Sequence, residues 1–152
     1  MYENLKKKFG QNFLIDKNIL LKITKLVDLS NLDILEIGPG SGKLTDYIIL
    51  KKPQKLTLIE IDKELAEDLL IKYSKFNYIK VVNANILEID LKETYQLVIS
   101  NLPYNISSQI IVKLALLNKS FKVFSENFLL ISVKILSPFS IFKFSLFGSL
   151  TE

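Results

Sequence analysis

The apolar positions of the chain follow two patterns that alternate along its first 118 residues. Short and nearly continuous apolar runs, typical of buried strands, occupy residues 32–38, 55–62, 78–87 and 95–101. Apolar residues at helical spacing, which predict amphipathic helices, occupy residues 17–27, 43–52, 63–75 and 107–118. Ser107 or Ser108 is a suitable N-cap for the last of these helices. Strands that alternate with helices in this way predict an α/β fold with a doubly wound, mostly parallel sheet.

The remaining residues have a different composition. Residues 121–150 contain seven Phe, six Ser, five Leu and three Ile, and they follow neither a strand period nor a helix period. Lys134 and Lys143 interrupt the apolar runs, so we expect no membrane-spanning segment there. The sequence therefore predicts one domain over residues 1–118 and an aberrant Phe/Ser/Leu/Ile-rich tail over residues 119–152.

Composition narrows the chemistry that the chain can perform. It contains no Cys and no His, which excludes disulfides, thiol nucleophiles, Cys/His zinc sites and His general bases. Catalysis would depend on carboxylates, amides, hydroxyls, Lys and a cofactor, and we expect no metal. The net charge of +4 is compatible with a nucleic-acid partner without proving one. The N-terminal residues lack the apolar segment of a signal peptide, so a cytoplasmic location is expected.

A glycine-rich motif, EIGPGSG at residues 36–42, lies between the first predicted strand and the helix after it. Gly38, Gly40 and Gly42 allow a tight turn and a close approach of the backbone to a ligand. The spacing differs from the dinucleotide motif G-x-G-x-x-G, because Lys43 occupies the place of its third glycine. The leading Glu36 also suits the loop of enzymes that use S-adenosylmethionine (SAM). A simple turn of any α/β fold is the alternative.

Acidic and amide residues end the next two predicted strands. Glu60 follows Gly38 by 22 residues, where a carboxylate can accept both ribose hydroxyls of an adenosyl group. Asp62 suits the N-cap of the next helix. Asn83 or Asn85 would reach the same edge of the sheet and could contact adenine, although a turn is an equally good role. These residues support nucleoside binding without choosing between NAD and SAM.

The fourth predicted strand ends in SNLPYNIS, residues 100–107. If the substrate is an exocyclic amine such as adenine N6, two acceptors aimed at its N–H groups would draw that nitrogen towards tetrahedral geometry. The side-chain oxygen of Asn101 and a carbonyl near Leu102 or Pro103 can accept these bonds, with Pro103 holding the loop rigid. Tyr104 offers a face for a flipped base. An Asn-x-Pro turn with a core tyrosine is the alternative.

KKFGQNFLID (7–16), EIGPGSG, LIEID (58–62) and SNLPYNIS together resemble the ribosomal RNA adenine N6,N6-dimethyltransferase family of the KsgA type. Its relatives are the erythromycin-resistance methylases and mitochondrial transcription factor B. The resemblance covers residues 6 to about 117. It implies a Rossmann-like SAM-dependent methyltransferase that dimethylates adenines near the 3′ end of small-subunit ribosomal RNA, with the small ribosomal subunit as partner and no membrane. We expect a monomer.

The resemblance also implies roles for individual residues. Asn12 and Leu14 would line the SAM site from an N-terminal arm, residues 1–16. Gly38 and Gly40 would contact the cofactor, and Glu60 would bind its ribose. Residues Asn101, Leu102, Pro103 and Tyr104 would form the catalytic loop, with Asn101 also lining the cofactor site. Asn85 stands where the family usually has an Asp that binds the cofactor's adenine, so its contact would lack charge.

The last part of the chain departs from the family. Nothing after about residue 118 matches the family's later strands or its C-terminal helical domain, so the chain is interpreted as a C-terminally truncated member whose sheet lacks its later strands. A catalytically inactive SAM- or RNA-binding remnant is therefore one alternative. An NAD-dependent oxidoreductase is another, disfavoured by the glycine spacing and the NLPY loop. A DNA adenine methylase is a close cousin, and FGQNFL favours the ribosomal RNA branch.

Overall fold

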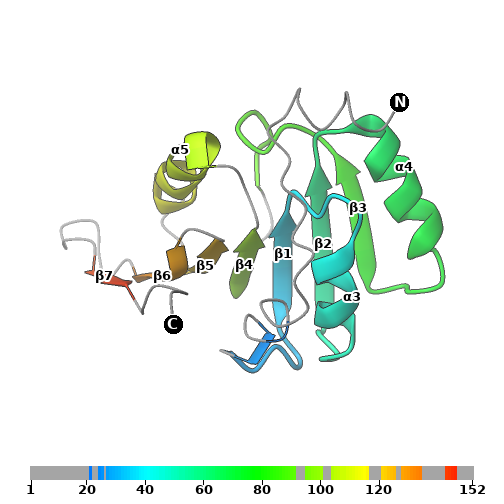
Figure 1. Cartoon of the computed structure of the whole chain (residues 1–152), viewed down its shortest axis with the longest axis horizontal. Coiled ribbons are helices and arrows are strands. Elements are labelled where there is room, and N and C mark those ends of the chain that lie inside the picture. Colours follow the sequence, from blue (N-terminus) through cyan, green and yellow to red (C-terminus); the bar gives the residue numbers. More distant parts are fainter. Residues whose placement is uncertain are drawn as a thin grey trace.

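One mostly parallel sheet organises the computed structural model, which describes residues 21, 24–25, 27–91, 95–100, 104–116, 121–125, 128–134 and 143–146. Its strand order is β3-β2-β1-β4-β5-β6-β7, which Figure 1 shows from right to left. The pairings from β3 to β5 are all parallel, and those of β6 are antiparallel. The doubly wound, mostly parallel sheet expected from the sequence is therefore confirmed.

The elements follow the predicted order. The strands are β1 (Asp33–Ile37), β2 (Lys55–Glu60), β3 (Ile79–Asn83), β4 (Leu97–Ser100), β5 (Phe121–Ser125), β6 (Phe128–Lys134) and β7 (Lys143–Leu146). The helices are α3 (Lys43–Ile49), α4 (Lys63–Lys72) and α5 (Tyr104–Leu116). The helix predicted over residues 17–27 lies largely outside the described residues. Within the described part of the chain, no helix combines the length and apolarity needed to cross a membrane.

Helices cover both faces of the sheet, and each face has its own core. Successive residues of a strand point to opposite faces, so Ile34 and Leu35 of β1 belong to different cores. Ile34 packs in the cluster that includes Ile48 of α3 and Leu69 of α4. Leu35 packs in the cluster that includes Ile110 of α5. Figure 1 shows α3 and α4 on one side of the strands and α5 on the other.

Two predicted boundaries are wrong. The third strand ends at Asn83 rather than at residue 87, because Asn85 starts a turn in which its own side chain accepts a hydrogen bond from the Leu87 amide. The helix α5 begins at Tyr104, so Ser107 and Ser108 lie inside it and neither is its N-cap. Proline, present in the sequence just before Tyr104, is favoured in the first turn of a helix.

The sheet also continues beyond residue 118. The strand β5 pairs in parallel with β4, and β6 and β7 extend the sheet further. The expectation that the later strands are missing is therefore wrong for these three segments. The hydrophobic periodicity gave no sign of them, because their pairing depends on partners elsewhere in the chain.

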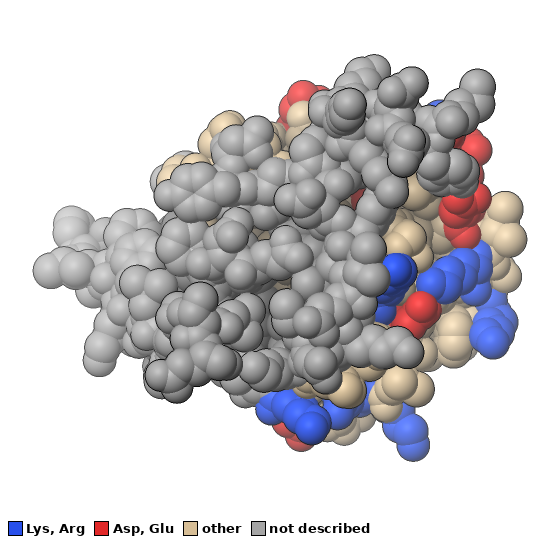
Figure 2. All heavy atoms as spheres, viewed as in Figure 1, with Lys and Arg blue, Asp and Glu red and all other residues tan. Residues whose placement is uncertain are grey.

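Charge is distributed unevenly over the described surface. On the face drawn in Figure 2, Lys side chains lie along the right and lower margins, and the largest group of acidic side chains lies at the upper right. The lower end of Figure 1 is the amino end of the parallel strands. On this face the Lys side chains therefore lie mostly away from the end of the sheet at which the parallel strands end.

Candidate cofactor-binding site

The four strands β1 to β4 end at one edge of the sheet. Ile37 at the end of β1 pairs with Ile59 of β2 and with Ser100 of β4. Glu60, the last residue of β2, pairs with Asn83, the last residue of β3. The carboxyl ends of these strands therefore lie together, at the upper end in Figure 1. Ligands of open α/β sheets bind at this edge.

The glycine motif forms a tight turn between β1 and α3. Gly38, Gly40 and Gly42 have φ angles of 68°, 57° and 77°, in the left-handed region that glycine adopts without steric cost. The Gly38 amide donates to the Ile59 carbonyl over 2.9 Å, and the Gly42 amide donates to the Pro39 carbonyl over 2.9 Å. The turn is thus attached to β2 at its start and closed on itself at its end.

Glu60 connects this turn to the start of α4. Its Oε2 accepts a hydrogen bond from the Gly40 amide over 2.9 Å, and its Oε1 accepts one from the Asp62 amide over 3.0 Å. The side chain is only 2% exposed, and this burial raises the pKa of its carboxyl group. A carboxylate oxygen can accept more than one hydrogen bond, so both oxygens retain capacity for hydroxyl donors.

The division of roles between Glu60 and Asp62 follows from their contacts. Asp62 is the N-cap of α4, and its Oδ1 accepts hydrogen bonds from the amides of Glu64 at 3.0 Å and Leu65 at 3.2 Å. The capping role predicted for Asp62 is confirmed. Glu60 does not cap the helix. Its carboxylate instead accepts the hydrogen bond from Gly40 in the glycine turn.

The asparagine that ends β3 and the one that follows it, Asn83 and Asn85, both have structural partners. Asn83 Nδ2 donates to the carbonyls of Glu60 at 2.9 Å and Ile61 at 3.2 Å. Asn85 Oδ1 accepts from the Leu87 amide at 3.0 Å, and its Nδ2 donates to Glu88 Oε1 at 2.8 Å. Both residues thus stabilise turns at the site edge. An amide oxygen has a second lone pair, so Asn85 keeps one acceptor position for a ligand.

The sequence interpretation missed one residue of this region, Lys113, and did not predict the buried contact of another, Glu36. Lys113 of α5 donates from Nζ to the carbonyls of Leu87 at 2.9 Å and Ile89 at 2.6 Å, so it attaches α5 to the segment after β3. Glu36 is 1% exposed and accepts from the Thr45 hydroxyl at 2.8 Å. Each is a charged residue inside an apolar run, which is the signal that could have identified it.

Several predicted site residues lie outside the described residues: Asn12, Leu14, Asn101, Leu102 and Pro103. Tyr104 is described only as the first backbone position of α5. The strand β4 ends at Ser100, opposite Ile37 and directly before the predicted catalytic residues. Of the predicted set, the structure brings together Gly38, Gly40 and Glu60 and places Asn85 in the segment that follows β3.

Comparison with known proteins decides between the alternatives. The family model described as "Ribosomal RNA adenine dimethylase" matches residues 2–131. The chain belongs to this family. The match extends through β5 and into β6, so the expectation that the family pattern stops near residue 118 is wrong. The resemblance stated from the motifs is confirmed, and the family match argues against the NAD-dependent alternative.

Curated members of the family are similar over most of this chain. Ribosomal RNA small subunit methyltransferase A of Pelagibacter ubique (strain HTCC1062) is 46% identical over 116 residues, which are 74% of this chain and 44% of that protein. The protein of the same name from Malacoplasma penetrans (strain HF-2) is 44% identical over 113 residues, covering 71% and 40%. The chain thus spans about half the length of the curated relatives that it matches.

Solved structures share the fold. A dimethyladenosine transferase from Plasmodium falciparum superposes with a TM-score of 0.65 at 25% identity, over 75% of this chain and 43% of that one. The 23S rRNA methyltransferase ErmE superposes with a TM-score of 0.62 at 31% identity, over 75% and 48%. This chain therefore has the Rossmann-like methyltransferase fold that its sequence predicts.

Proposed function

We propose that this chain binds SAM and transfers methyl groups to N6 of adenines in small-subunit ribosomal RNA. The observation that carries the proposal is the buried Glu60 carboxylate bonded to the Gly40 amide at the edge where the strands end. The curated relatives are named as methyltransferases of this RNA, which supports the substrate class. A cytoplasmic monomer that acts on the small ribosomal subunit is part of the proposal.

The described residues fit the cofactor. The oxygens of Glu60 can accept the two ribose hydroxyls, and Gly38 and Gly40 present backbone without side chains to the rest of the molecule. Asn85 would accept from the adenine amino group, and Asn12 and Leu14 would complete the site from the N-terminal arm. When bound, SAM supplies an electrophilic methyl group on its sulfonium.

The chain's own residues would make the target amine reactive. The lone pair of an adenine amino group is delocalised into the ring, so this nitrogen is a weak nucleophile. The Asn101 side-chain oxygen and a carbonyl at Leu102 or Pro103 would accept its N–H bonds and localise the lone pair, while Tyr104 stacks the base. The proton leaves after the nitrogen becomes cationic. No strong general base is needed, in agreement with a chain that lacks His.

Methyl transfer tests this proposal. The full chain should transfer tritiated methyl groups from SAM to undermethylated small ribosomal subunits, and digestion of the RNA should release N6,N6-dimethyladenosine. Asn101→Ala should lower the rate by about 100-fold or more, because it removes an acceptor used in the transition state, while changing SAM affinity by less than about tenfold. Labelled products other than N6-methylated adenines would contradict the assignment.

A chain that binds SAM or RNA without transferring methyl groups is the second candidate. This candidate predicts saturable SAM binding and RNA binding without methyl transfer. The same assay separates the two functions, provided that SAM binding is measured on the same preparation.

Asn85 offers a test of the adenine contact. Asn85→Asp restores a charged acceptor, but it also places a carboxylate beside Glu88, whose Oε1 is 2.8 Å from Asn85 Nδ2. We therefore expect little gain from Asn85→Asp alone and about fivefold tighter SAM binding from Asn85→Asp combined with Glu88→Gln, measured by calorimetry. Glu88→Gln alone is the control. Unchanged affinity in the double variant would show that residue 85 does not contact the cofactor.

A further inference from the structure

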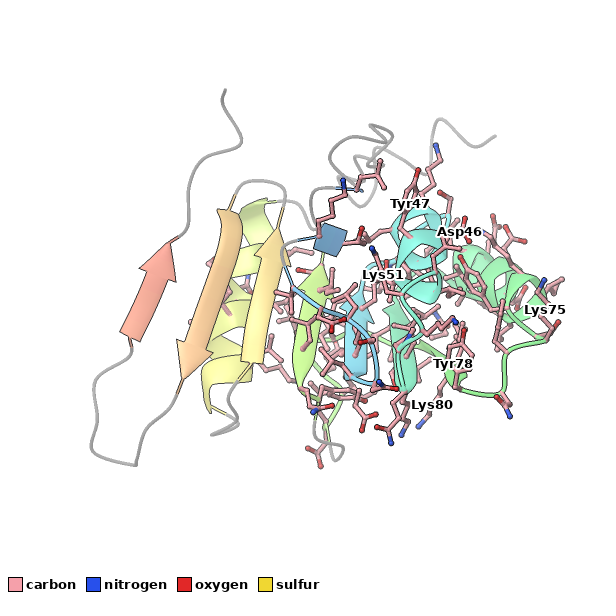
Figure 3. The ribbon with its side chains drawn as sticks, turned by 90° about the horizontal axis from the view of Figure 1, so that it is seen from below. Asp46, Tyr47, Lys51, Lys75, Tyr78 and Lys80 are labelled. Atoms are coloured by element: carbon pink, nitrogen blue, oxygen red, sulfur yellow. The ribbon has the colours of Figure 1, made fainter. Side chains whose placement is uncertain are left out.

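The C-terminal end of α4 contacts the exit of the glycine turn. The Tyr73 hydroxyl lies 2.8 Å from the Gly42 carbonyl oxygen and 2.8 Å from Asp46 Oδ1, so its single proton is shared between these acceptors. Lys72 Nζ lies 2.8 Å from Asp46 Oδ2 and 3.3 Å from the Ser41 carbonyl oxygen. Figure 3 shows Asp46 on the side of α3 that faces α4. The last two residues of the turn are thus held by two neighbouring side chains.

The shapes of Gly42 and Tyr73 match closely. Gly42 has a φ of 77°, and a Cβ added to it would overlap the Tyr73 hydroxyl and come within 3.0 Å of Leu69 Cδ2. Tyr73 is 4% exposed. Burial and the bond to Asp46 raise the pKa of the Tyr73 phenol, so it stays a hydrogen-bond donor throughout the neutral range. The hydroxyl therefore occupies the space that the missing side chain of Gly42 leaves.

The other end of α4 begins at Glu60. Asp62, the N-cap of α4, donates its amide to Glu60, and Glu60 accepts in turn from Gly40 in the middle of the turn. One helix thus holds the turn at two positions: through Glu60 at its N-terminal end and through Tyr73 and Lys72 at its C-terminal end. These contacts attach the middle and the end of the glycine turn to the two ends of α4.

We propose that Tyr73 and Lys72 are positioning residues that hold the glycine turn in the shape that binds SAM. The proposal rests on the proposed function only for the identity of the ligand. Without the Tyr73 hydroxyl, the Gly42 carbonyl loses a buried donor, and the turn samples other conformations. The apparent association constant for SAM is then the intrinsic constant multiplied by the fraction of molecules whose turn keeps the competent shape.

Two conservative variants with matched controls test this proposal in the full chain. Tyr73→Phe should weaken SAM binding about fivefold to tenfold and speed amide exchange of residues 38–46 by a similar factor. Tyr78→Phe, which removes a hydroxyl from a half-buried tyrosine outside this network, should change neither. Lys72→Met should weaken binding about twofold to threefold, because its ion pair with Asp46 is partly exposed, and Lys75→Met should have no effect. Figure 3 labels both control residues.

Calorimetry and hydrogen exchange together distinguish the outcomes. If Tyr73→Phe lowers only the unfolding free energy, and leaves SAM affinity and exchange of residues 38–46 at the wild-type values, Tyr73 is a packing residue and the proposal is wrong. If the wild-type chain does not bind SAM, the proposed function is wrong. Amide exchange of residues 38–46 then still shows whether Tyr73 holds the glycine turn. Faster exchange in Tyr73→Phe but not in Tyr78→Phe would support the positioning role.

Discussion

Glu60→Gln should weaken SAM binding about 100-fold, the largest effect on affinity that the structure predicts. A glutamine has one acceptor oxygen, and its NH₂ group would face either the Gly40 amide or the Asp62 amide, both of which are donors. The substitution removes charged acceptors for the ribose hydroxyls and weakens the attachment of the glycine turn. Hydrogen bonds to charged groups contribute about 1.5–3 kcal/mol each, which sets this magnitude. Calorimetric titration with SAM measures it.

The pH dependence of binding gives an independent check on Glu60. Burial raises the pKa of its carboxyl group, so wild-type affinity should fall on acidification at a pH above the ordinary range of glutamate. Glu60→Gln should lack this fall. Glu64→Gln, which alters an exposed carboxylate in the first turn of α4, is the control and should bind like the wild type. Wild-type affinity in Glu60→Gln would remove Glu60 from the site.

Glu36→Gln should stabilise the chain by several kcal/mol above about pH 8 and leave its stability almost unchanged below about pH 4.5. Burial raises the pKa of Glu36 from 4.5 to about 8 in the folded chain. The folded state therefore holds the proton more tightly than the unfolded state. The stabilisation from this proton is complete below about pH 4.5 and is lost as the pH rises through about 8. A glutamine at position 36 stays neutral at every pH, so the variant does not lose stability in this way as the pH rises.

Urea unfolding of the wild type and of Glu36→Gln at about pH 5, 7 and 9 measures this difference. The difference between the two unfolding free energies should widen as the pH rises. In the wild type, folding at high pH requires Glu36 either to be buried with its charge or to bind a proton that the unfolded chain has released. Glu67→Gln, at an exposed position of α4, controls for the loss of one negative charge and should track the wild type. A constant gap across the series would mean that Glu36 ionises normally in the folded chain.

Periodicity predicted most of the first 118 residues because each element there has its own local pattern. The strands β1 and β2 are mostly apolar and are buried on both faces, as is typical of parallel strands between two layers of helices. The strand β3 ends earlier than the apolar pattern predicts, because Asn85 begins a turn with a hydrogen bond to its own side chain, which an apolar pattern does not record. The strands β5 to β7 depend on pairing with β4 and with one another, which no local window contains.

The site residues that lie at the ends of strands could be predicted from the sequence. Parallel topology brings Gly38, Glu60 and Asn83 to one edge, so their convergence followed from the order of elements alone. The contact between Tyr73 and Gly42 joins residues 31 positions apart, and no motif signals it. It depends on how α4 packs against α3, which is decided by the core around Ile48 and Leu69.

The central claim is that the edge formed by the glycine turn and Glu60 is a SAM site. Isothermal titration of the purified, full chain with SAM tests it most directly. We expect saturable one-to-one binding with a dissociation constant in the micromolar range, which corresponds to a binding free energy of about −8 kcal/mol. If a folded, monodisperse protein shows no binding up to about 1 mM SAM, the binding free energy is weaker than about −4 kcal/mol, and the claim is contradicted.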